Sequence, residues 1–456
     1  MTFGRGNMKK LNIKDQVQVN SKRINKKIHN YLVNVLPQAY RKDDELCNSI
    51  LTWLLIGIMI RLIIIPFACH GDLISTYRRS YLLLTEHNLL FLNPHEVIQA
   101  IFLAIYVHVL PLQELLFWEG VSVPTSFWLN NFVTHPYVFK TLFLFKIPYL
   151  LADIGTSFII LKLFEDRPNS GFVAYKLWML NPITIYTFYI FGRYDSITIF
   201  IIAVGLYLLK IGRILLASLS FGFAILDRYY PVIFLPILFG VYKKKRFYTK
   251  VLMLIASLIP LLIYTCIIKS LNLKFQYYGI DFAKSDFINY VTAMKFRLDG
   301  LGQEIYLFIV FYIILLAFIF LYDLEEKKAF QDFVLFSLAT LLIFYSTSIF
   351  HPQYFSWFIL FLAIYYGHKQ DDKIIAFHTL QAMLFVFYTF YWGKATFGWM
   401  FSSLAPQILT NLASPFELIN EVYPSLKLIN MCRSALSGVS ISMVMYTLYK
   451  RIRVGE

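Results

Sequence analysis

The amino-acid sequence predicts an all-α polytopic membrane protein. Of its 456 residues, 58% are hydrophobic and only 15% are charged, and the mean hydropathy is +0.60. A soluble domain of this length would need a larger polar surface. Apolar runs recur between residues 50 and 449, and many approach the roughly 20 residues that a helix needs to cross a bilayer. The first 48 residues are mostly polar and basic, unlike a cleavable signal peptide.

The apolar runs predict a bundle of about 12 transmembrane helices, and the placement of lysine and arginine orients it. We expect a basic cytoplasmic tail at residues 1–48, a single transmembrane domain at 49–450 and a cytoplasmic end at 451–456. The expected spans are residues 51–69, 138–163, 172–191, 197–209, 214–226, 231–242, 251–268, 305–322, 330–349, 354–367, 374–392 and 431–449.

Topology therefore explains the net charge of +15, and no nucleic-acid partner is predicted. The four cysteines have no metal-ligand spacing, and the sequence supports no disulfide. The basic clusters are Lys9-Lys10, Lys22-Arg23, Lys26-Lys27, Lys243-Lys244-Lys245-Arg246, Lys327-Lys328 and Lys450-Arg451-Ile452-Arg453.

Three outer loops follow from this topology, at residues 70–136, 269–300 and 393–430. Residues 98–117 are apolar but carry His108, Pro111 and Glu114. If they spanned the membrane, every later loop would change sides, and the lysine-rich cluster at 243–246 would lie outside. We therefore expect an interfacial or re-entrant helix there, and a surface-lying helix at 73–92.

The first span ends directly on His70-Gly71-Asp72, which places a carboxylate and an imidazole at the membrane surface. Other isolated polar residues fall in short loops on the same outer face. Ionisable groups at span edges are costly, so function is their default interpretation, although snorkelling at helix ends is an alternative. The polar residues of this face are His70, Asp72, Arg193, Asp195, Asp227, Arg228, His351, Gln353 and Lys394.

These residue types suit group transfer from a lipid phosphate. A carboxylate can act as general base toward an attacking hydroxyl, which gives Asp72 the catalytic role. Guanidinium and imidazole groups can neutralise a phosphate leaving group, which suggests Arg193, Arg228 and His351. His70, Asp195, Asp227, Gln353 and Tyr354 complete the expected donor-phosphate or substrate site.

Each of these residues also has a structural interpretation. Asp72 could be the N-cap of the 73–92 helix, because Asp is favoured there. Arg193 and Asp195 could be a cap and its neighbour, and Asp227 with Arg228 a local ion pair. His351-Pro352-Gln353-Tyr354 could be a turn before the next helix. We expect Arg61, Lys146 and Asp153, inside apolar runs, to pair within the bundle.

Four segments in order resemble the GT-C superfamily of polyprenyl-phosphate-sugar-dependent glycosyltransferases, especially the group related to the GPI-anchor mannosyltransferases. The resemblance covers about residues 50–360. Arg193 stands where the family usually has Gln, and Asp227-Arg228-Tyr229-Tyr230-Pro231 stands where it usually has Lys-Pro. The segments are His70-Gly71-Asp72; Lys146-Ile147-Pro148-Tyr149-Leu150-Leu151-Ala152-Asp153; Asn181-Pro182 with Gly192-Arg193-Tyr194-Asp195-Ser196; and His351-Pro352-Gln353-Tyr354.

The resemblance implies a GT-C fold and an inverting hexosyl transfer, with a hexose such as mannose, on the extracytoplasmic face of the cell membrane. It implies a polyprenyl-phosphate-linked sugar donor, a lipid, glycan or protein acceptor, and Asp72 as the base. No acidic-x-acidic motif is evident in the first outer loop, so no metal and no cofactor are predicted; dependence on a divalent cation stays open.

Two other classes remain alternatives. A lipid-linked polysaccharide polymerase or ligase would use a similar donor, but would need a large outer loop with paired His or Arg. A lipid or sugar transporter would need internal repeats and polar residues near the bilayer midplane, and no clear repeat is found.

Overall fold

The computed structural model describes residues 33–88, 92–116, 131–271, 286–298 and 302–454, and it is helical almost throughout. Most of the predicted cytoplasmic tail lies outside the described residues, as do parts of the predicted outer loops 70–136 and 269–300. Among described residues, six helices are long and apolar enough to cross a membrane. The predicted all-α polytopic class is confirmed, and the count of about 12 spans stays a prediction.

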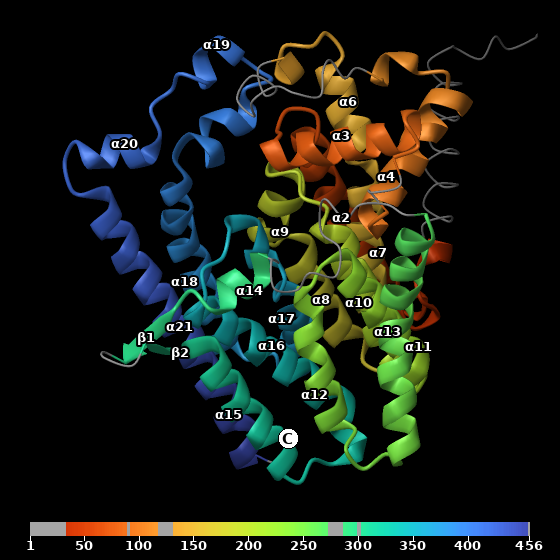
Figure 1. The fold of residues 1–456 in the computed structure, drawn as a ribbon. Helices are drawn as coiled ribbons and strands as arrows, with labels where there is room; N and C mark the ends of the chain where they lie inside the picture. The colour runs from red at the N-terminus through yellow and green to blue at the C-terminus, as the bar shows by residue number, and fades with distance from the viewer. Residues whose placement is uncertain (1–32, 89–91, 117–130, 272–285, 299–301, 455–456) are drawn as a thin grey trace, which may run out of the picture.

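The first half of the chain forms a series of helices from α2 to α12, with α3 and α4 at one end of the bundle and α11 along its side (Figure 1). Their bounds are α2 (Asp44–Ile64), α3 (Gly71–Thr85), α4 (Pro94–Ala104), α6 (Val138–Phe145), α7 (Ile147–Leu163), α8 (Pro168–Met179), α9 (Pro182–Ile185), α10 (Asp195–Lys210), α11 (Ile214–Asp227) and α12 (Phe234–Val241).

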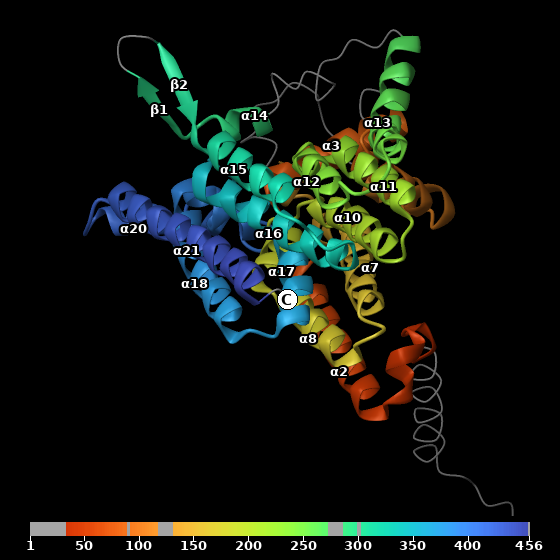
Figure 2. The ribbon, with the colours of Figure 1, turned by 90° about the horizontal axis from the view of Figure 1, so that it is seen from below.

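The second half adds further helices and one antiparallel hairpin, β1–β2, which projects from the bundle (Figure 2). The bounds are α13 (Phe247–Ser270), α14 (Asp286–Val291), β1 (Lys295–Leu298), β2 (Gln303–Tyr306), α15 (Leu307–Leu321), α16 (Ala329–Thr347), α17 (Ile359–Lys369), α18 (Asp372–Thr389), α19 (Pro406–Leu409), α20 (Pro415–Asn420) and α21 (Ser425–Val454).

Short 3₁₀ or π-type turns connect or extend these helices. They are Gln38–Lys42, Ile105–Val109, Gln113–Leu115, Tyr186–Ile190, Tyr230–Ile233, Glu326–Lys328, Pro352–Ser356, Phe390–Thr396 and Gly398–Phe401.

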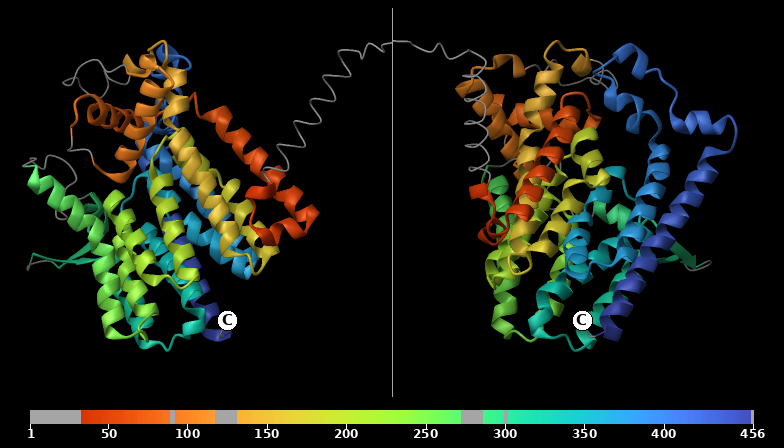
Figure 3. Two further views of the ribbon diagram at one scale, coloured as in Figure 1. Left: turned by 90° about the vertical axis from the view of Figure 1, so that its right-hand side faces the viewer. Right: turned by 180° about the vertical axis from the view of Figure 1, so that it is seen from behind.

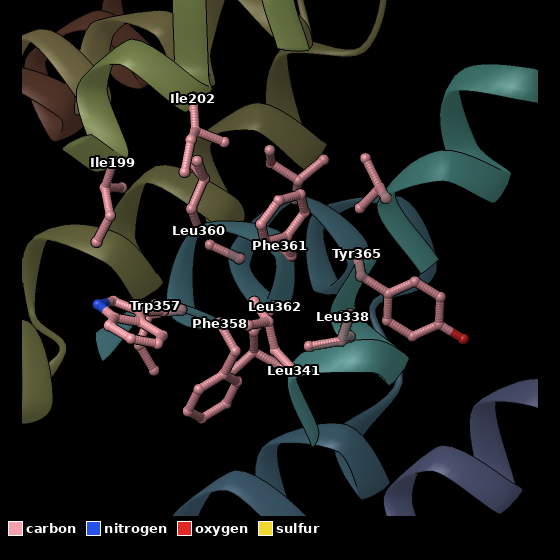
Figure 4. Packing of buried hydrophobic residues seen from close by; sticks show 14 of the residues in the cluster. Ile199, Ile202, Leu338, Leu341, Trp357, Phe358, Leu360, Phe361, Leu362 and Tyr365 are labelled. Atoms are coloured by element: carbon pink, nitrogen blue, oxygen red, sulfur yellow. The ribbon is translucent and has the colours of Figure 1, made fainter. Parts of the chain in front are cut away.

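The bundle is built around α16 and α17, whose side chains are buried on nearly every face. Leu341 of α16 lies beside Leu362 of α17 and Leu338 lies beside Tyr365, whereas Leu360 on another side of α17 is directed toward Ile202 (Figure 4). A helix that is apolar all round is expected in such a central position. By contrast, α2 lies at the edge beside α8 (Figure 3) and α13 exposes much of its apolar surface, as helices facing lipid do.

The two ends of the bundle differ. The α12–α13 connection, which carries Lys243–Arg246, lies at the same end as the α15–α16 connection and the C-terminus, whereas α3 and α4 lie at the other end (Figure 1). Helix α4 and the turn to Val109 follow α3 and pack on it. The segment predicted as interfacial is thus a short helix in a helix pair.

Several boundaries differ from those predicted. Helix α2 begins at Asp44, inside the predicted tail, because Asp43 caps it by accepting from the Leu46 amide at 3.0 Å. The predicted span 172–191 is broken at Asn181-Pro182 into α8, α9 and a π-type turn. The β1–β2 hairpin in the region of the second predicted outer loop was not predicted.

A buried ion pair joins the helices, as predicted for Arg61 and Asp153, whereas Lys146 donates to backbone carbonyl oxygens. Arg61 Nε donates to Asp153 Oδ2 at 2.6 Å, and both side chains are completely buried. Asp153 also accepts from Trp178 Nε1 and Tyr189 Oη, each at 2.7 Å. These contacts join α2, α7, α8 and the turn before Gly192 into one framework.

Candidate functional site

Asp72 lies in the first turn of α3, and His70 is the N-cap of that helix. The Nδ1 atom of His70 accepts a hydrogen bond from the Asp72 amide at 3.1 Å. The alternative interpretation of Asp72 as the N-cap is therefore wrong, because the imidazole already fills that role. The Asp72 carboxylate is left to point at other partners, and 34% of its side chain is exposed.

The main partner of Asp72 is Arg193. Arg193 Nη1 lies 2.8 Å from Asp72 Oδ2, and Gln353 Nε2 donates to the same oxygen at 3.4 Å. Burial alone would raise the pKa of Asp72, but the positive charges of Arg193, His70, Arg228 and His351 together lower it to about 2. The carboxylate is therefore ionised at any physiological pH.

A sharp turn delivers Arg193 to this position. The π-type turn Tyr186–Ile190 ends just before Gly192, whose φ of +77° suits glycine. A Cβ at Gly192 would lie 3.0 Å from Leu73 Cδ2 and 3.3 Å from Lys146 Cε. Both the backbone conformation and the close packing thus require glycine before the arginine.

Asp195 is the buried centre of the arginine cluster. Its Oδ2 lies 3.3 Å from Arg193 Nε and 3.3 Å from Arg228 Nη2, and its Oδ1 accepts from Trp357 Nε1 at 2.7 Å. Its side chain is completely buried and holds the two guanidinium groups in place. Carboxylates and guanidinium groups thus alternate in one chain of ion pairs, in the order Asp72, Arg193, Asp195 and Arg228.

Asp227 does not pair with Arg228, so the predicted alternative of a local ion pair is wrong. Its Oδ1 accepts from both the backbone amide and the Nδ1 of His95, each at 2.8 Å, and its Oδ2 accepts from the Thr198 hydroxyl. Arg228 reaches instead across to Asp195. The two neighbours point in different directions because α11 ends at Asp227 and Arg228 has extended backbone.

The ring of Tyr194 connects these groups. The His95 imidazole stacks on it, with centroids 3.4 Å apart and planes within 3°. The guanidinium carbons of Arg193 and Arg228 lie 4.6 and 4.4 Å from the Tyr194 ring centroid, a cation–π arrangement that favours positive charge there. Arg228 also lies 5.4 Å from the ring of Tyr354.

His351 lies beside this cluster. Its Nδ1 accepts from Trp392 Nε1 at 3.2 Å, and its ring makes edge contacts with Tyr290 and Tyr354. It is half-buried and contributes positive charge near Asp72 when protonated. Lys394, predicted on the same face, instead lies 3.9 Å from Glu417.

A pocket opens next to Arg228, between the α3–α4 pair and the turn that follows α11. Of the predicted residues, Asp227, Arg228 and Tyr354 line it; Asp72, Arg193 and His351 do not. The cluster is thus a single network, but only part of it faces this pocket. The lining residues are Arg79, Asn93, His95, Glu96, Tyr194, Leu226, Asp227, Arg228, Tyr229, Tyr230, Phe287, Tyr290, Tyr354 and Trp357.

Sequence reasoning missed Arg79, His95 and Glu96. Glu96 pairs with Arg79 and accepts from Asn93 Nδ2 at 3.0 Å. Burial would raise the pKa of Glu96, but the close approach of His95 and the positive charge of Arg79 lower it to about 2. A signal was available, since Pro94-His95-Glu96 places two ionisable residues at the start of an otherwise apolar helix.

Among the described residues, no group of three His, Cys, Asp or Glu side chains could hold a metal ion. The prediction that no metal or cofactor is required is not tested by this geometry and stays a prediction. The chemistry that the cluster itself offers is an ionised carboxylate beside two guanidinium groups.

Comparisons with known proteins relate the chain to one group. It is 34% identical over 118 residues to GPI mannosyltransferase 1 of Kluyveromyces lactis, covering 25% of this chain and 29% of that protein. It is 30% identical over 104 residues to GPI mannosyltransferase 1 of Saccharomyces cerevisiae, covering 22% of this chain and 26% of that protein.

Over 96 residues it is also 30% identical to GPI mannosyltransferase 1 of Candida albicans, covering 20% of this chain and 24% of that protein. The matches thus span about a quarter of the length of these curated relatives. No family model and no solved structure matches. The predicted relationship to the GPI-anchor mannosyltransferase group is confirmed by the three matches.

Proposed function

We propose that this protein is an integral-membrane hexosyltransferase that moves a sugar, with mannose favoured, from a polyprenyl-phosphate donor to an acceptor hydroxyl. The observation that carries the proposal is the Asp72–Arg193–Asp195–Arg228 network. It places one half-exposed carboxylate next to two guanidinium groups at the end of the bundle that holds α3. The similarity to three GPI mannosyltransferases supports the same class and the choice of mannose.

The reaction assigns a separate task to each part of the network. The acceptor oxygen attacks the anomeric carbon of the donor, and a new C–O bond forms as the bond to the lipid phosphate breaks. The bonding electrons leave with the phosphate, and Arg193 and Arg228 stabilise its charge. Asp72 takes the proton of the acceptor hydroxyl as general base. Attack from the face opposite the leaving phosphate inverts the anomeric configuration.

The ion pair between Asp72 and Arg193 must loosen for this to occur. A carboxylate bound to a guanidinium is a weak base, because the pair favours its charged form. A donor phosphate competes for Arg193 and lowers the positive charge that Asp72 experiences. Donor binding thereby makes Asp72 a better proton acceptor at the moment when the acceptor attacks.

The proposed side of the membrane follows from charge. The Lys243–Arg246 loop and the C-terminus lie at the end of the bundle remote from α3 and α4 (Figure 1). Lysine- and arginine-rich loops are retained on the cytoplasmic side. This supports termini in the cytoplasm and an active site on the extracytoplasmic face.

The direct test is Asp72→Asn in the purified full-length protein, reconstituted with polyprenyl-phosphate mannose and a panel of acceptors. Loss of a general base is expected to lower turnover by about 10²–10⁴-fold, with donor binding retained. Asp323→Asn is the matched control. Asp323 lies in the α15–α16 connection, its side chain is 86% exposed, and it pairs with Lys244 of the α12–α13 connection. Near-wild-type turnover in Asp72→Asn would refute the role of this residue.

A further inference from the structure

Four buried polar atoms of the residues lining the pocket beside Arg228 make no hydrogen bond within the described residues. One of them, Arg79 Nε, is ion-paired with Glu96; the other three are His95 Nε2, Arg228 Nε and Tyr230 Oη. All three residues line this one pocket, and His95 and Tyr230 are only 2% and 1% exposed. Buried polar groups nearly always have partners, so each such group requires an explanation. Three of them around one pocket point to a polar ligand.

The geometry defines what each atom offers. Asp227 Oδ1 already accepts from the His95 amide, so the His95 Nδ1 must donate to it. His95 Nε2 lies 3.6 Å from Glu96 Oε1, just beyond hydrogen-bond distance. Arg228 Nε is a donor, and the Tyr230 hydroxyl both donates and accepts. Hydroxyl groups, which also do both, are the natural partners of such a mixed set.

The charges of the pocket are matched internally. Arg79 pairs with Glu96, His95 with Asp227, and Arg228 with Asp195 outside the pocket. A ligand with a large net charge would find no unmatched counter-charge here. Arg228 differs from the other charged residues of the pocket, because its counter-ion lies outside the pocket. It therefore connects the pocket with the Asp72–Arg193–Asp195 network.

We propose that this pocket binds the hexosyl phosphate head of the lipid donor, with the phosphate at Arg228 and the hexose hydroxyls at Tyr230 and His95. The inference rests on the proposed function and assigns the donor's place within it. Asp72 lies outside the pocket, beyond Tyr194 and Arg193, so the acceptor hydroxyl approaches from that side. Tyr230 and His95 are then determinants of sugar specificity.

The test is Tyr230→Phe, which removes only the unpartnered hydroxyl and keeps the stacking on Trp357, whose ring centroid lies 3.8 Å away. Tyr186→Phe is the matched control, because the Tyr186 hydroxyl is also buried without a hydrogen bond to any described residue, but Tyr186 does not line the pocket. Binding of two probes to the full-length protein is measured: polyprenyl-phosphate mannose and polyprenyl phosphate without sugar.

Tyr230→Phe is expected to raise the Kd for polyprenyl-phosphate mannose about two- to tenfold, the effect of one neutral hydrogen bond, and to leave the Kd for polyprenyl phosphate unchanged. Tyr186→Phe should change neither. Unchanged binding of the mannosyl lipid by Tyr230→Phe, or an equal loss for both lipids, would overturn the assignment. A change confined to the KM of the acceptor would place the acceptor's sugar in the pocket and would also overturn it.

Failure of this inference can be told from failure of the proposed function. If the wild-type protein transfers mannose and Tyr230→Phe binds both lipids as the wild type does, only the pocket assignment falls. If the wild-type protein binds neither lipid and transfers no sugar, the proposed function falls and the pocket assignment falls with it.

Discussion

Arg193 Nη1 lies 2.8 Å from Asp72 Oδ2, across 121 residues of sequence, and this contact sets the charge state of the proposed base. The same guanidinium reaches Asp195 with its Nε at 3.3 Å. The proton affinity of Asp72 therefore depends on where one arginine side chain is directed.

Arg193→Gln should change the pH dependence of transfer. In the wild type the pKa of Asp72 is about 2, so kcat/KM should be insensitive to this group at any practical pH. Arg193 lowers the pKa of Asp72 more than His70, Arg228 or His351, so removing it lets burial raise that pKa and the base becomes protonated at higher pH. Activity of Arg193→Gln should then fall as pH is lowered toward about 4, in a range where the wild type stays flat.

The control for this profile is Arg213→Gln, since Arg213 is exposed in the loop between α10 and α11. Its pH profile should match that of the wild type. A flat profile for Arg193→Gln would mean that Arg193 does not control the protonation of Asp72.

Gly192→Ala should impair both folding and transfer. Gly192 and Gly212 share a φ of +77°, but a Cβ at Gly212 would meet no atom within 4 Å, whereas one at Gly192 would press on Leu73 and Lys146. The backbone term alone costs about 1–2 kcal/mol. Thermal unfolding in detergent should show this loss for Gly212→Ala and a larger one for Gly192→Ala, with reduced turnover only in the latter. Equal losses would refute the packing argument.

His70 should act through the helix it caps. His70→Ala removes the acceptor for the Asp72 amide, at an expected cost of about 0.5–2 kcal/mol in stability. Asn is a favourable N-cap, so His70→Asn should restore stability and most of kcat. His70→Phe can keep the stacking on Phe191, whose centroid lies 3.8 Å away, but not the cap. If Phe restored kcat and Asn did not, stacking and not capping would be the relevant contact.

Breaking the buried pair of Arg61 and Asp153 should destabilise the bundle. Asp153→Asn leaves the Arg61 guanidinium buried without a counter-charge, which costs about 3–5 kcal/mol. Asp323→Asn, at an exposed pair, should cost no more than about 1 kcal/mol. Unfolding measured in detergent would separate the two, and the double variant Arg61→Met with Asp153→Leu should recover part of the loss. Wild-type stability in Asp153→Asn would contradict the framework role.

The bounds of a helix were predicted well where charged residues stand at both ends of an apolar run. Residues 197–209 and 214–226 were expected as spans, and α10 and α11 nearly coincide with them. Breaks inside apolar runs were harder to foresee. The kink at Lys146, between α6 and α7, depends on carbonyl groups of distant segments, and a local pattern contains no information about them.

For the candidate site, the sequence predicted which residues share one face but not which partners they contact. Asp72, Arg193, Asp195 and Arg228 were all expected on one face, and the structure joins them. The pairing of Asp227 with His95 could not be predicted, because 132 residues separate them and the helix that carries His95 looked merely interfacial. Tertiary packing decides where the side chain of a turn residue points, and the periodicity of apolar residues along the sequence contains no information about that packing.

Lys146 gives the site a mechanical property. Its ammonium group donates to the carbonyl oxygens of Ile65 and Tyr189 at 3.0 and 2.8 Å, and to that of Ala68. Lys146 thus holds together the segment that precedes Asp72 and the segment that precedes Arg193. A substitution at Lys146 would therefore release both segments at once, and with them the spacing between the proposed base and the proposed leaving-group arginine.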